Sequence, residues 1–212
     1  MSLKETFTTL MDSARKHFEV EQKLSIANLN NLFNPNPNLL TGTKDFDGFE
    51  ETQLWSKADF SHIENNSQNT VEISTKHEWN GLTKKANLNP GTYTFSVSYY
   101  VDSDYPSNGA LNIFILNGEG NVYDIVDHPM LDNLLVPVKN KWQRASITFT
   151  VKQASDKFAF RLESTVPGIL QVSSYKLERG MLATPWCPAS SEVGGVAKAL
   201  LCVLLPVRGC AA

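Results

Sequence analysis

The chain has 212 residues, of which 42% are hydrophobic and 19% are charged, and its net charge is −3. These values exclude a disordered chain and the basic field that nucleic acid or an anionic membrane would require. No apolar run approaches the roughly 18 residues of a membrane span, and the N-terminus mixes charged and apolar residues, unlike a secretory signal. We therefore expect neither a nucleic acid nor a membrane as partner.

Residues 1–36 are predicted to form helices. Apolar side chains recur at spacings of three and four in residues 3–18, and KLSIANLNNLF (23–33) repeats the pattern. The proline-rich NPNPN (34–38) then ends helical geometry. Because a short helix with an exposed apolar stripe needs a partner, we expect this segment to attach the chain to other proteins or to form a homo-oligomer, with a trimer as our guess. The alternative is that it folds back on the next domain.

From residue 37 to residue 192 the pattern predicts a mainly β domain. Strand-like alternation occurs in TVEIST (70–75), YTFSVSYYV (93–101), ALNIFIL (110–116), ASITFTV (145–151), KFAFRLE (157–163) and ILQVSSYKLE (169–178). Turn residues, and no helical patterns, lie between these strands, which is typical of an antiparallel β-sandwich, or jelly roll. The apolar set of each strand should form the core, and the polar set, which includes Arg161, should face solvent.

Catalytic and metal-binding motifs are not found in the sequence. It carries no GxSxG, phosphate-binding glycine loop or HExxH motif, and its four histidines are scattered. Paired carboxylates, such as Asp102 with Asp104, leave glycoside hydrolysis open as an alternative. The three cysteines all follow residue 186, so the domain folds without a disulfide framework. We predict a protein that is not an enzyme and has no cofactor.

Aromatic and polar residues outside the predicted core suggest saccharide binding. A sugar ring has an apolar C–H face and a belt of hydroxyls, so a binding site combines an exposed aromatic ring with hydrogen-bonding groups. The candidate residues are Trp79, Tyr100, Asp102, Tyr105, Trp55, Asn112 and Arg161. Trp55 is equally compatible with core or surface, and Tyr105 with a ligand contact or a turn. We interpret Trp142 as core or sheet-edge packing and Trp186 as a packing anchor.

The closing stretch KLERGMLATPWCPASSE (176–192) resembles the end of β-sandwich modules in tail and baseplate proteins of phages that infect Gram-positive bacteria. The segments WNGL (79–82), LNPGTYTFSVSYYV (88–101), WQRASITFTV (142–151) and FAFRLES (158–164) resemble carbohydrate-binding jelly rolls related to families 4 and 9. This resemblance implies a virion protein, made in the host cytoplasm, that binds host cell-wall saccharide. Many relatives hold calcium through an aspartate near the last strand, where this chain has Ser173 and Ser174, which argues against calcium.

The predicted organisation is a helical attachment segment (1–36), a carbohydrate-binding-module-like sandwich (37–192) and a C-terminal tail of unassigned role (193–212). Within residues 176–192, Gly180 should permit the turn out of the sheet, and Trp186 should pack back to close the sandwich. The main alternative function is a purely structural virion or decoration protein whose sandwich contacts only other proteins.

Overall fold

A computed structural model describes residues 36–52, 59–65, 68–75, 77–117, 126–127 and 132–192. The described residues form eleven strands: β1 (Glu50–Thr52), β2 (Asp59–Asn65), β3 (Gln68–Thr75), β4 (Asn80–Leu88), β5 (Gly91–Tyr100), β6 (Leu111–Asn117), β7 (Val126–Asp127), β8 (Asp132–Leu135), β9 (Gln143–Val151), β10 (Ser155–Ser164) and β11 (Gly168–Arg179). The predicted helices of residues 1–36 lie, apart from residue 36, outside this part of the chain. Among the described residues, no helix is long and apolar enough to cross a bilayer.

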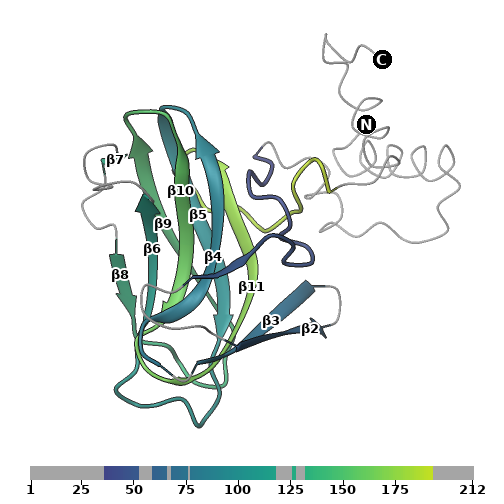
Figure 1. Ribbon diagram of the computed structural model, residues 1–212, viewed down its shortest axis with the longest axis vertical. Helices are drawn as coiled ribbons and strands as arrows, with labels where there is room; N and C mark the ends of the chain where they lie inside the picture. The colour runs from purple at the N-terminus through teal and green to yellow at the C-terminus, as the bar shows by residue number, and fades with distance from the viewer. Residues whose placement is uncertain are drawn as a thin grey trace, which may run out of the picture. The chain divides into compact units, whose positions relative to one another are not determined.

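The strands form two antiparallel sheets that face each other, as predicted (Figure 1). The five-stranded sheet has the order β1-β4-β10-β6-β8, and the six-stranded sheet has the order β2-β3-β11-β5-β9-β7. β10 and β11, which follow each other in the sequence, thus lie inside different sheets. The fold is a mainly β, antiparallel sandwich.

Alternate side chains of each strand fill the space between the sheets, as the alternation predicted. On β5, the side chains of Tyr93, Phe95, Val97 and Tyr99 are buried, and β10 contributes three more apolar residues in the same way. The rings of Phe95 and Phe160 join the two sheets, with centroids 5.2 Å apart. Burying one such side chain stabilises a fold by about 1.5–3 kcal/mol, so this apolar layer is the main source of stability.

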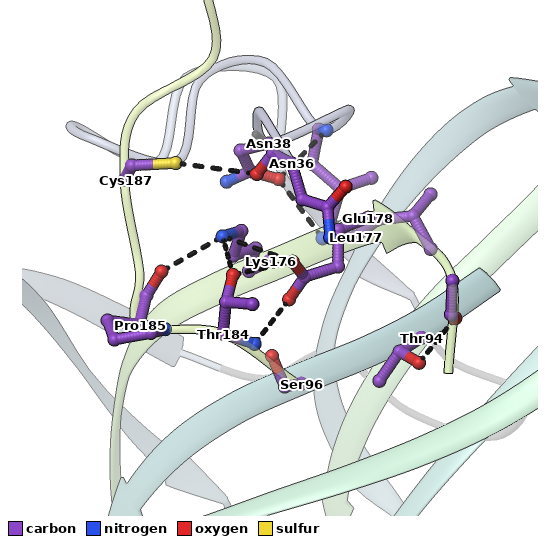
Figure 2. Close-up of polar contacts among 12 residues, drawn as sticks. Asn36, Asn38, Thr94, Ser96, Lys176, Leu177, Glu178, Thr184, Pro185 and Cys187 are labelled. Atoms are coloured by element: carbon purple, nitrogen blue, oxygen red, sulfur yellow. Dashed lines mark hydrogen bonds and ion pairs between the residues drawn. The ribbon is translucent and has the colours of Figure 1, made fainter. Parts of the chain in front are cut away.

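Two segments that flank the sandwich meet on β11: the leading segment (residues 36–49) and the closing segment (residues 180–192). Asn38 and Ala189 form an isolated parallel bridge between them. β11 is irregular between Ser173 and Lys176, and Ser174 has a left-handed φ of 59°. Asn38 lies beside this irregularity: its amide donates to the Tyr175 carbonyl (2.8 Å) and its Oδ1 accepts from Leu177 N (3.0 Å), as Figure 2 shows for Leu177.

The closing segment crosses the outer face of the six-stranded sheet and buries an ion pair there (Figure 2). Lys176 Nζ donates to Thr184 Oγ1 (2.6 Å) and to the Pro185 carbonyl (2.9 Å), and it lies 3.4 Å from Glu178 Oε2. Glu178 in turn accepts hydrogen bonds from Thr184 N (2.8 Å) and Thr184 Oγ1 (2.6 Å). Both charged side chains are wholly buried. The prediction that this stretch closes the module is confirmed.

The turn into the closing segment has the predicted glycine geometry. Gly180 has a φ of 101°, a value that side chains disfavour, and its carbonyl accepts from Thr94 Oγ1 (2.8 Å). Trp186 is half-buried, and its Nε1 atom is buried without a hydrogen-bond partner among the described residues. The expectation that the outer polar side chains all face solvent is wrong here: Thr94 and Ser96 are buried, and their hydroxyls bond to the Gly180 carbonyl and to Arg144.

Candidate functional site

Trp79 lies on the surface immediately before β4, in a strained backbone conformation. Its side chain is 40% exposed, and its φ is 57°. His77 and Glu78, which precede it, are also exposed. A bulky residue in the left-handed region is an outlier, and such outliers concentrate at functional sites. The prediction that Trp79 is exposed is confirmed.

A buried arginine holds the backbone of Trp79. Arg161 Nη2 donates to the Trp79 carbonyl (2.9 Å), and Nη1 donates to Thr83 Oγ1 (3.3 Å). The Arg161 Nε atom donates to Glu163 Oε2 at 2.6 Å. The predicted solvent exposure of Arg161 is wrong, because its side chain is wholly buried on the outer face of the central strand β10. Arg161 therefore positions Trp79 from below the surface.

Glu163 and Asn112 extend this buried polar cluster onto β6. Asn112 Nδ2 donates to Glu163 Oε1 (3.3 Å), and Asn112 Oδ1 is buried without a hydrogen-bond partner among the described residues. Burial raises the pKa of the Glu163 carboxyl, and the Arg161 guanidinium and the Asn112 amide oppose this shift. The predicted hydrogen-bonding role of Asn112 at the surface is not supported, because its side chain is only 6% exposed. It bonds to the Arg161–Glu163 pair instead.

Gly81 permits the close approach of β4 to β10 beside Trp79. A Cβ atom at this position would lie 2.1 Å from the Leu162 carbonyl oxygen and 2.5 Å from Glu163 Cα. Both obstacles are backbone atoms, so no side-chain movement could relieve the clash. The surface turn that carries Trp79 is therefore built by three features: a left-handed tryptophan, a buried arginine and an obligatory glycine.

Tyr105 and Asp102 have structural roles in the loop after β5. Tyr105 is only 2% exposed, and its hydroxyl bonds Ser164 Oγ (2.7 Å) and the Ala110 carbonyl (3.0 Å). The interpretation of Tyr105 as an exposed ligand contact is therefore wrong. Asp102 Oδ1 accepts from the backbone N–H groups of Asp104 (3.0 Å) and Tyr105 (3.1 Å), as aspartate does in turns.

Tyr100 is not connected to the cluster around Trp79: its hydroxyl bonds to Asn140, and its ring contacts Trp142. It belongs to β5 of the six-stranded sheet, whereas Trp79 adjoins β4 of the five-stranded sheet. The predicted residues therefore do not form one site: Trp79, Arg161 and Asn112 are connected, and Tyr100 is separate. Trp55 lies outside the described residues.

Trp142 does not lie in the core, which was one of the two interpretations of the sequence; packing at the edge of the sheet, the other, agrees with its contact to Tyr100. It is 39% exposed, and its ring contacts that of Tyr100, with centroids 5.8 Å apart and planes inclined by 38°. The alternation contained a usable signal: Ile147, Phe149 and Val151 occupy odd positions and are buried, so an even-numbered residue extending β9 faces outwards.

The described residues contain no group of three or more His, Cys, Asp or Glu side chains that could hold a metal ion. Trp79 and Trp142 each present a partly exposed indole ring at the surface.

No protein-family model matches the chain, and no curated protein matches it. Solved structures do resemble it. One is an arabinose-bound GH51 α-L-arabinofuranosidase, with a TM-score of 0.53 and 12% identity, covering 69% of this chain and 27% of that one. Another is the CBM22-1 xylan-binding domain of Paenibacillus barcinonensis Xyn10C (TM-score 0.43, 13% identity, 70% and 94% covered). A third is the enzymatically active domain of bacteriophage CBA120 tailspike protein 4, with a TM-score of 0.45 and 10% identity, covering 68% of this chain and 21% of that one.

The aligned region spans only about a quarter of the arabinofuranosidase and a fifth of the tailspike domain. At these identities the likeness concerns the fold alone. The first comparison supports the assignment of the chain as a β-sandwich.

Proposed function

We propose that the chain is a non-enzymatic saccharide-binding protein and that Trp79 provides its principal sugar contact. The observation that carries this proposal is the way in which Trp79 is held. Its exposed ring belongs to a residue with left-handed backbone geometry, and the wholly buried Arg161 donates a hydrogen bond of 2.9 Å to its carbonyl. Left-handed geometry costs roughly 1–2 kcal/mol for a residue with a side chain. Glycine or asparagine at position 79 would avoid much of that cost, so stability alone does not explain tryptophan there.

The buried ion pair between Arg161 and Glu163 supports the same proposal. Removing two charges from water costs several kcal/mol per ion, and well-packed apolar residues often stabilise a fold at least as well. Arg161 and Glu163, 2.6 Å apart and almost completely buried, serve to fix the turn that carries Trp79. A preformed aromatic surface binds a sugar ring without the entropy cost of ordering a loop.

The chemistry around Trp79 suits a sugar. The indole face can cover the C–H face of a pyranose, while the exposed side chains of His77 and Glu78 offer hydrogen-bonding groups for its hydroxyls. Fold similarity to carbohydrate-binding modules agrees with this assignment but does not carry it.

The closing signature supports a more specific setting: a phage tail or baseplate protein that binds host cell-wall saccharide. In that setting residues 1–36 would join the module to other virion proteins or to further copies of the chain, with a trimer as the proposed assembly. Several copies on one particle would raise the avidity of a weak individual site. An antibody raised against residues 37–192 should label the tails of particles that carry the protein.

The test is a pull-down of the full chain with purified Gram-positive cell walls. Trp79→Ala should lower the affinity at least tenfold, or about 1.4 kcal/mol, while the melting temperature changes by less than about 3 °C because the side chain is exposed. Val136→Ala, at a position that is 82% exposed, is the matched control and should bind normally. Unchanged binding by a folded Trp79→Ala protein would contradict the proposed site.

The two alternative functions give different results in the same experiment. A protein that makes only protein contacts would bind no cell wall even as an oligomer. A glycoside hydrolase would release reducing ends from the wall polymer, and a single carboxylate substitution would abolish that release.

A further inference from the structure

The outer face of the six-stranded sheet is divided between a covered and an exposed part. The closing segment covers the part around Lys176, Ser96 and Thr94 (Figure 2). Its boundary is marked by Arg144, which donates to Thr184 O (3.2 Å) on one side and to Ser98 Oγ (3.4 Å) on the other. Beyond Arg144, this face presents the Tyr100–Trp142 pair.

The Tyr100–Trp142 pair is fixed by its surroundings. The Tyr100 hydroxyl donates to Asn140 Oδ1 (3.3 Å), and Asn140 N donates to the Val101 carbonyl (2.8 Å). Asn140 has a φ of 58°, a conformation that asparagine tolerates better than most residues. Gln143 Nε2 closes the same turn by donating to the Val138 carbonyl (3.0 Å). The turn before β9 is thus pinned in the conformation that places Trp142 against Tyr100.

Hydrogen-bonding groups continue the row that these rings begin. Gln171 pairs in register with Tyr100 on one side and with Glu72 on the other. Their neighbours in sequence on β11 and β3, Val71 among them, point into the core, so these three side chains share the outer face. Gln171 Nε2 donates to Glu72 Oε2 at 3.1 Å. That bond uses one of two amide hydrogens and one of two carboxylate oxygens.

We propose that Tyr100, Trp142, Gln171 and Glu72 form a second saccharide-binding site, on the outer face of the six-stranded sheet. The two rings offer an apolar surface for the C–H face of a pyranose, and the amide–carboxylate pair beside them can bind its hydroxyls as donor and acceptor. The occupant is a neutral sugar, because the Glu72 carboxylate would repel a uronate or a phosphate-bearing polymer. This inference extends the proposed saccharide binding, but it stands on different residues.

Two separate sites make one copy of the chain bivalent. Such a module can hold two glycan strands, or two points of one strand, and the second binding event then gains from a high effective concentration. Trp142 is the decisive residue, because its indole N–H signal reports on this site and not on the Trp79 site.

The experiment follows the four tryptophan indole N–H signals by nuclear magnetic resonance as neutral oligosaccharides are added to the full chain. Xylohexaose, cellohexaose and an N-acetylglucosamine hexamer are the probes, with trigalacturonate as the charged comparison. Trp→Phe substitutions assign the signals. With at least one neutral probe, the Trp142 signal should shift to saturation, and it should do so equally in a Trp79→Ala chain. Trigalacturonate should shift it at least tenfold more weakly.

The variants separate this site from the first. Tyr100→Ala should weaken the response of the Trp142 indole signal about tenfold and leave the Trp79 signal responsive, and Val136→Ala serves as the exposed apolar control. If one or more probes shift the Trp79 signal and none shifts the Trp142 signal, the second site is overturned and the proposed function is left intact. The reverse result would support the second site and contradict the first. A Trp142 response that disappears in Trp79→Ala, or no Trp142 response to any probe, would overturn the inference, while cell-wall binding independently tests the proposed function.

Discussion

Lys176→Met should destabilise the sandwich far more than its position on an outer sheet face would suggest. The substitution removes the cation at 3.4 Å and leaves the Glu178 carboxylate buried, with hydrogen bonds from Thr184 N (2.8 Å) and Thr184 Oγ1 (2.6 Å) and with the charge of Arg144 as its remaining electrostatic partner. The side chains of both charged residues have no exposed surface. Breaking a buried pair by removing one partner costs about 3–5 kcal/mol. For a domain of this size, that corresponds to a fall of roughly 6–20 °C in melting temperature.

The assay is urea unfolding followed by circular dichroism and tryptophan fluorescence. The chain supplies its own control in Lys85 and Glu50, whose side chains lie 2.8 Å apart but are 59% and 49% exposed. Glu50→Gln should cost no more than about 1 kcal/mol, because water screens an exposed pair. The double variant Lys176→Met/Glu178→Leu should recover most of the loss, since no buried charge is left uncompensated.

The reasoning would be refuted if Lys176→Met cost as little as Glu50→Gln. It would also fail if the double variant were destabilised by the sum of the two single changes, because coupled neighbours should not be additive.

The remaining predictions concern glycines and tyrosines. Gly81→Ala should lower the free energy of unfolding by at least about 3 kcal/mol, because its Cβ would meet backbone atoms of β10. Gly180→Ala, which has open space around it, should lower it by only about 1 kcal/mol. Equal losses in urea unfolding would contradict this reasoning. Burial raises the pKa of the Tyr175 hydroxyl above its usual 10.0. The unfolded chain then loses that proton first, so the free energy of unfolding should fall above pH 10.5 by up to about 1.4 kcal/mol per unit, less steeply in Tyr175→Phe. Tyr105→Phe should cost about 1–2 kcal/mol through two lost hydrogen bonds without changing cell-wall affinity; weaker binding by the folded variant would restore Tyr105 as a ligand contact.

The fold could be predicted because alternation is a local property. Phe95, Phe149 and Phe160 each belong to a set of apolar residues at every second position of their strand, and all three are buried. The same rule placed Thr94 and Arg161 on outer faces, which is where they lie. It could not predict that they would be buried, because burial of an outer face depends on segments distant in sequence.

The candidate site was harder to predict for a related reason. Exposure of Trp79 followed from its polar neighbours, but its separation from Tyr100 depends on sheet order, which no alternation pattern contains. Tyr105 looked like a loop residue next to proline, yet its hydroxyl bonds Ser164, 59 residues away. The alternation in residues 145–151 would have predicted an outward-facing Trp142 had it been extended three residues towards the N-terminus.

The bridge between Asn38 and Ala189 joins the points where the chain enters and leaves the sandwich, and we expect it to govern the response of the domain to mechanical load. The chain enters and leaves the sandwich side by side, so a force that pulls these two points apart reaches the bridge and the Asn38–Leu177 hydrogen bond first. The central strands would be loaded only after those contacts break. The leading and closing segments would thus detach from β11 before either sheet comes apart.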